Sequence, residues 1–242
     1  MTTLLLVRHG LTAMTGPLLA GWTPGVALDE RGRAQVRALG GRLAPVPLAA
    51  VVSSPLDRCL ETADAVAAGR DGIEKVRVDE RFGEVRYGDW TGRPLKELAE
   101  EPLWRVVQAH PSAARFPGED GEALADAQHR AVTAVRDWNA RIAGEHGEDA
   151  VYAVCSHGDI IKAIVADALG LHLDQFQRIQ AAPASVTVIR YTELRPFVVR
   201  LNDVGGDVAD LLPPPPRSED EENGGDAGGA GGRGDAAVGG GA

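Results

Sequence analysis

The chain has 242 residues, a formal net charge of -10 at pH 7, and a composition that is 44% hydrophobic and 25% charged. This composition is typical of a globular protein with a sizeable core, and the acidic balance argues against nucleic-acid partners and anionic membrane surfaces. No run approaches the roughly 18 apolar residues of a membrane span. With only two cysteines there is no disulfide framework or zinc spacing. We expect a cytoplasmic protein.

Strand-like and helix-like segments alternate up to about residue 203. Short apolar runs predict strands, and apolar residues spaced by three and four predict helices. In chain order we expect a strand over 3–7, a helix over 30–43, a strand over 48–52, a helix over 55–68, a strand over 76–78, a helix over 94–107, a helix over 121–143, a strand over 150–154, a helix over 160–170, and strands over 186–191 and 197–201. The alternation predicts an α/β fold, a three-layer α/β/α sandwich around a mostly parallel central sheet.

The composition changes sharply after residue 203. Four consecutive prolines at 213–216, an acidic cluster at 219–222 and a Gly/Ala-rich end cannot supply a hydrophobic core. We expect a single folded domain over residues 1–203, which would carry the activity, and a disordered tail over 204–242.

Three of the predicted strands run into polar motifs. The first ends in Arg8 and His9, and the second is followed by Arg58, one turn into the next helix. The strand near residue 150 ends in His157. In open α/β sheets, ligands bind beyond the carboxyl ends of the strands, so neighbouring strands would gather these side chains around one crevice. Two guanidinium groups and two imidazoles indicate an anion site, and phosphate is the obvious anion.

Phosphoryl transfer places particular demands on such a site. Charge spreads over three oxygens, which favours arginine because its planar group contacts two oxygens at once and keeps its proton. Two histidines with different partners can divide attack and proton donation. A leaving alkoxide also needs a proton, and Glu84, in the segment over 82–90, is our candidate acid. Thr12 is a further candidate for the pocket wall.

These segments resemble the motifs of the histidine phosphatase superfamily, the phosphoglycerate-mutase-like group. The resemblance runs in order over residues 3 to 192, through LLLVRHGLT, SSPLDRCLETA, RFGEVRYGDWTG, FPGED (in which one glycine is missing) and VCSHGDIIKAI. It implies that His9 is phosphorylated during turnover and that Glu84 is the proton donor. It also implies that the phosphoryl group is bound by Arg8, Arg58 and His157.

The resemblance further implies a phosphatase that uses neither a metal nor a cofactor and acts on a small phosphate ester. The interval from Glu84 to His157 lacks the longer insertion expected of a glycolytic mutase, which favours hydrolysis over transfer to a substrate hydroxyl. A phosphomutase stays open, as do an inactive module that binds phosphorylated ligands and a metal hydrolase that uses His9, His157 and Asp159. Asp159 departs from the family pattern. Neither the ester nor the oligomeric state follows from the sequence.

Overall fold

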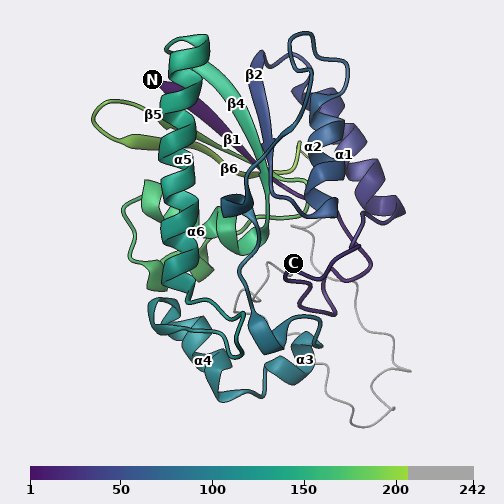
Figure 1. Ribbon diagram of the computed structural model, residues 1–242, viewed down its shortest axis with the longest axis vertical. Helices are drawn as coiled ribbons and strands as arrows, with labels where there is room; N and C mark the ends of the chain where they lie inside the picture. Colours follow the sequence, from purple (N-terminus) through teal and green to yellow (C-terminus); the bar gives the residue numbers. More distant parts are fainter. Residues whose placement is uncertain (207–242) are drawn as a thin grey trace.

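A computed structural model of the chain describes residues 1–206 (Figure 1). The predicted disordered tail lies outside the described residues from position 207 onward, so the domain boundary expected at residue 203 stays a prediction. Within the described part of the chain, no helix is both long enough and apolar enough to cross a membrane.

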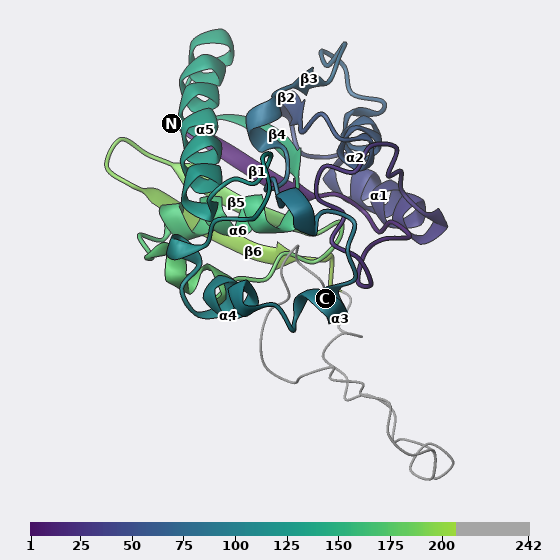
Figure 2. The same ribbon diagram turned by 60° about the horizontal axis from the view of Figure 1, so that its bottom comes forward.

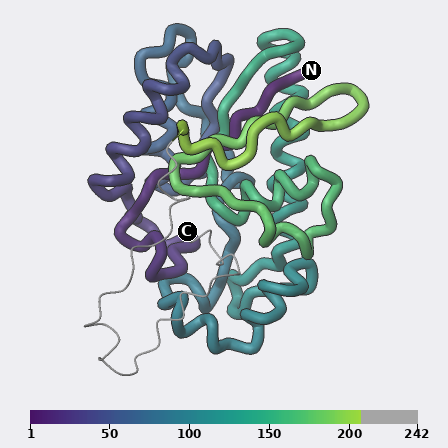
Figure 3. Tube along the Cα trace, turned by 180° about the vertical axis from the view of Figure 1, so that it is seen from behind, coloured from purple at the N-terminus to yellow at the C-terminus, as the bar shows by residue number. Residues whose placement is uncertain are grey.

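A six-stranded sheet runs through the centre in the order β3-β2-β4-β1-β5-β6 (Figure 2). The strands are β1 (Thr2–Arg8), β2 (Leu48–Ser53), β3 (Arg77–Val78), β4 (Ala150–Ser156), β5 (Val186–Tyr191) and β6 (Pro196–Asp203). The first four of the sheet pair in parallel, whereas β5 and β6 are added antiparallel beyond β1. Seen from behind, the β5–β6 hairpin crosses the molecule at its surface (Figure 3).

Helices cover both faces of the sheet because the central strands are apolar on both sides. In β1, Leu4 and Leu6 pack into one core cluster, and Leu5 and Val7 into the other. The α-helices are α1 (Glu30–Leu43), α2 (Asp57–Ala67), α3 (Leu95–Leu98), α4 (Pro102–Ala109), α5 (Leu124–His146) and α6 (Gly158–Ala168). Helices α5 and α6 pack on the first cluster, and α1 and α2 on the second (Figure 1). The predicted three-layer α/β sandwich is confirmed.

The prediction of one helix over 94–107 is wrong. The chain forms two short helices there, and α4 begins at Pro102. Proline lacks the N–H that would continue the helical hydrogen bonds of α3, and it fits the first position of a new helix. Short 3-10 turns complete the connections: η1 (Glu80–Phe82), η2 (Gly88–Trp90), η3 (Pro111–Ala113) and η4 (Leu173–Arg178).

The three strands with polar ends are neighbours at the centre of the sheet. In the pairing register, Arg8 of β1 lies beside Ser156 of β4, and Ser53 of β2 lies beside the preceding residue of β4. Gly10 allows the chain after β1 to pass close to α1, because a Cβ there would lie 2.8 Å from the Gly32 carbonyl oxygen. The sheet therefore brings three separate motifs to one edge.

Candidate active site

Four predicted side chains meet beyond these strand ends. Arg58 donates from Nε to His9 Nε2 at 3.3 Å, and the rings of His9 and His157 lie edge to face with centroids 5.2 Å apart. Arg8 is buried beside them, and all four side chains are at most 6% exposed. The structure therefore brings the two imidazoles and the two guanidinium groups together, as the sequence predicted.

The hydrogen-bond partners of His9 assign its tautomer. Its Nδ1 lies 2.8 Å from the carbonyl oxygen of Gly10, which only accepts, so Nδ1 carries the proton of the neutral ring. Nε2 faces the Nε–H of Arg58, which only donates, so Nε2 presents a lone pair. Burial, followed by the charges of Arg58 and Arg8, lowers the pKa of His9 well below its ordinary value. The ring is neutral at neutral pH and is chemically able to attack through Nε2.

His157 is the second imidazole, and it lies deeper than the sequence indicated. Its Nε2 is 2.7 Å from Ser54 Oγ and 3.4 Å from Cys59 Sγ, and its side chain is fully buried. Burial, then Arg58 and His9, lowers its pKa well below the ordinary value. His157 lies behind His9 and is not among the residues that line the cavity. A phosphate dianion would raise its pKa, because an opposite charge favours the protonated ring.

The two arginines are prepared for an anion. Each guanidinium donates to one backbone carbonyl at 2.7 Å. Within the described residues, Nη1 of Arg58 is buried and has no hydrogen-bond partner. A buried charged N–H without a partner is costly, so this atom indicates a ligand oxygen.

Glu84 is a buried carboxyl group at the same site. It lies in the loop over 83–87, here called the Glu84 loop, and its Oε1 accepts from the backbone N–H of Val85 at 3.0 Å. Burial, and then the negative charge of Asp159, raises its pKa to about 7. A carboxyl group with a pKa near neutrality can both give and take a proton at the same pH.

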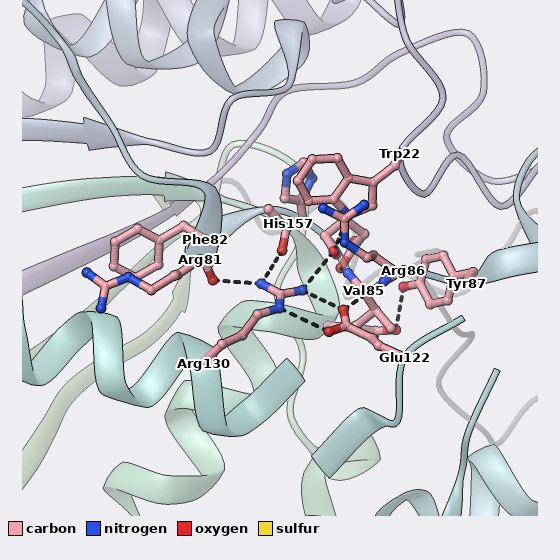
Figure 4. Close-up of polar contacts among 12 residues, drawn as sticks. Trp22, Arg81, Phe82, Val85, Arg86, Tyr87, Glu122, Arg130 and His157 are labelled. Carbon is pink, nitrogen blue, oxygen red and sulfur yellow. Dashed lines mark hydrogen bonds and ion pairs between the residues drawn. The ribbon is translucent and has the colours of Figure 1, made fainter. Parts of the chain in front are cut away.

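Arg130 of α5 donates hydrogen bonds to the Glu84 loop and to the residues before it (Figure 4). Its Nη1 donates to the carbonyl oxygens of Arg81 and Gly83 at 2.7 and 2.9 Å, and its Nη2 donates to that of Glu84 at 2.9 Å. Glu122 accepts from Nη2 and Nε of the same guanidinium at 2.6 and 3.1 Å. Arg130 and its carboxylate partner therefore help to fix the position of the acid.

Arg130 and Glu122 were not predicted from the sequence. Glu122 lies two positions after the FPGED segment. Trp22 was not predicted either. Its Nε1–H donates to the carbonyl of Glu84 at 2.5 Å, and its ring lies under the guanidinium of Arg86 at 4.0 Å. None of these three residues follows a predicted strand or lies in a segment that resembles the family.

A cavity opens above these groups. It is lined by Arg8, His9, Thr12, Met14, Thr15, Gly16, Leu18, Leu19, Ala20, Gly21, Arg58, Glu84, Tyr87 and Leu95. Thr12 lies in the wall, where its hydroxyl is 3.0 Å from that of Thr15. Asp159 lies deeper and accepts from Tyr87 Oη at 2.8 Å and Lys162 Nζ at 3.2 Å. Among residues 1–206, no group of three or more His, Cys, Asp or Glu is arranged to hold a metal ion.

Comparison with known proteins identifies the family. The sequence profile described as "Histidine phosphatase superfamily (branch 1)" matches residues 4–204. The chain belongs to this superfamily. This histidine phosphatase is 32% identical over 181 residues to the glucosyl-3-phosphoglycerate phosphatase of Mycolicibacterium vanbaalenii, covering 72% of this chain and 76% of the relative. It is 31% identical over 178 residues to phosphoserine phosphatase 1 of Hydrogenobacter thermophilus, covering 72% and 80%.

Among solved structures, Bacillus stearothermophilus YhfR matches this histidine phosphatase with a TM-score of 0.72 at 30% identity. The match covers 84% of this chain and 98% of that one. The predicted superfamily and fold class are thereby confirmed, and so is the expectation that the chain is an enzyme of this kind.

Proposed function

We propose that the protein hydrolyses small phosphate monoesters and passes the phosphoryl group through His9 to water. The observation that carries the proposal is the neutral, buried His9, whose Nε2 presents a lone pair beside two buried guanidinium groups. A phosphate dianion supplies the acceptor that Nη1 of Arg58 lacks within the described residues. The same dianion offsets the charge of Arg8.

In the first step, Nε2 of His9 attacks phosphorus and forms the P–N bond. The ester P–O bond breaks, its electron pair leaves with the alcohol oxygen, and Glu84 gives that oxygen a proton. Arg8 and Arg58 bind the non-bridging oxygens, and each charge-assisted hydrogen bond contributes about 1.5–3 kcal/mol. His157, once protonated by the approach of the dianion, adds a positive charge next to His9.

In the second step, water attacks the phosphohistidine. Glu84, now a carboxylate, takes a proton from the water, the P–N bond breaks, and its electron pair returns to Nε2 of His9. Phosphate leaves and the enzyme regains its starting protonation. One carboxyl group serves both steps because its pKa of about 7 lets both forms exist near neutral pH.

Phosphate release from a panel of monoesters tests the proposal, with EDTA present and His9→Ala as control. We expect wild type to release phosphate in EDTA and the variant to release almost none. An isomerised product without free phosphate would favour the phosphomutase. Tight binding of phosphorylated ligands without turnover would favour the inactive module, and loss of activity in EDTA would favour the metal hydrolase.

We also propose that the enzyme acts in the cytoplasm on a small soluble ester, without a nucleic-acid or membrane partner. The net charge of -10 supports this, because it repels other polyanions. So do Cys59 and Cys155, which are free and buried, with burial raising the pKa of Cys59 to about 12. Buried, protonated thiols suit a reducing compartment.

A further inference from the structure

We propose that this site selects monoesters whose alcohol part is uncharged and apolar, and that it discriminates against alcohols carrying a carboxylate or a second phosphate. The inference rests on the proposed phosphatase function and specifies its substrate class. It follows from the part of the cavity that lies above the phosphate-binding groups.

Among the described residues that line the cavity, positive charge lies only on buried side chains. Of the described residues that line it, only Arg8, His9 and Arg58 carry or can carry a positive charge, and all three are committed to the phosphoryl group. The cavity is also lined by Met14, Leu18 and Leu95, which are half-buried apolar side chains. The alcohol part of an ester would therefore meet these three apolar side chains, together with uncharged threonine hydroxyls.

Two arginines of the described residues, each next to or two positions from a lining residue in the sequence, are engaged elsewhere. Arg86 lies over the ring of Trp22 at 4.0 Å, and Arg93 pairs with Glu101 at 2.9 Å. Neither arginine lines the cavity. The hydroxyl of Tyr87, which does line it, donates its proton to a carboxylate at 2.8 Å. A carboxylate on the substrate would thus lose water without gaining a counter-charge, which is unfavourable.

The apolar wall is fixed by backbone hydrogen bonds between the segments 14–21 and 92–95. Leu19 donates to the carbonyl of Arg93 at 3.0 Å and accepts from Gly92 at 2.7 Å. Leu95 donates to the carbonyl of Pro17 at 3.0 Å. These bonds hold the backbone of Leu95 beside the segment 14–21.

The test compares two esters of the same shape. Isoamyl phosphate ends in two methyl groups where the phosphate ester of 3-hydroxypropionate ends in two carboxylate oxygens. We expect wild type to have a kcat/KM at least about tenfold higher for isoamyl phosphate, a difference of roughly 1.4 kcal/mol. In Leu95→Lys the ammonium group supplies the missing counter-charge, so the preference should shrink about tenfold or reverse.

Leu194→Lys is the matched control. Leu194 is 86% exposed in the turn between β5 and β6, away from the cavity, so the same added charge should leave the preference unchanged. If Leu95→Lys does not fold, as judged by circular dichroism, Leu18→Lys takes its place on the neighbouring segment.

The outcomes separate this inference from the proposed function. Hydrolysis of neither ester by wild type would contradict the phosphatase itself. Hydrolysis of both, with the carboxylated ester turned over equally well or better, would contradict only the substrate class. An equal shift of preference in Leu95→Lys and Leu194→Lys would attribute the effect to net charge and would also overturn the inference.

Discussion

Replacing Arg130 by methionine removes the five hydrogen bonds that join α5 to the Glu84 loop and Glu122. Charge-assisted hydrogen bonds contribute about 1.5–3 kcal/mol each when buried, but the Arg130 side chain is 21% exposed, so water replaces part of what is lost. We expect a loss of roughly 3 kcal/mol in the free energy of unfolding. We also expect kcat for alkyl esters to fall about 100-fold, the usual effect of displacing a catalytic group by about 1 Å.

The assay separates positioning from general destabilisation. p-Nitrophenolate leaves without a proton, so kcat for p-nitrophenyl phosphate should fall far less than kcat for isoamyl phosphate, and KM should change little because the arginines that bind phosphate are untouched. Arg141→Met is the matched control on the same helix, since Arg141 is 59% exposed and pairs with Glu145 at the surface. We expect about 0.5 kcal/mol or less from it in urea unfolding. Equal rate losses for the two esters, or equal effects in the two variants, would refute the positioning role of Arg130.

Three further predictions concern charges at the site. Arg8→Lys should lower kcat at least about 100-fold in steady-state assays, because an ammonium group cannot bind two oxygens at once; near-normal turnover would mean that Arg8 has another role. Asp159→Asn should lower the pKa of Glu84 and move the basic limb of the kcat/KM profile to lower pH; an unmoved limb would show that the two carboxyl groups are not coupled. Glu84→Gln should be more stable than wild type at pH 8 by about 3 kcal/mol in urea unfolding. Folding raises the pKa of Glu84 from 4.5 to about 7, so the stability contributed by the protonated carboxyl group is lost as pH rises through that window. The advantage should vanish below about pH 4.5, and a constant difference across pH would contradict the raised pKa.

The centre of the site could be predicted because the ends of the strands can be recognised in the sequence. Buried apolar runs stop where Arg8, His9 and His157 begin, and parallel packing of those runs forces their ends together. The break between α3 and α4 was also visible, as a proline in the middle of a helical pattern, and was missed. Arg130 gave no such signal, because its partners are carbonyl oxygens whose direction depends on how a loop packs against α5.

The burial of His157 behind His9 could likewise not be predicted from the sequence. Its partner, Ser54, comes from a different strand end, and only the pairing of β2 with β4 brings the two together. Motif order therefore specifies which residues form the site, whereas the depth of each side chain and its hydrogen-bond partner depend on tertiary packing.

Transfer of phosphate to one imidazole is most directly tested by rapid quenching. Wild type is mixed for milliseconds with a monoester labelled in its phosphoryl group, stopped in alkali, digested and analysed by mass spectrometry. We expect the label on His9, stable in alkali and released in acid, and absent from His9→Ala. Steady hydrolysis without any labelled protein, or a label that persists in His9→Ala, would contradict the phosphohistidine.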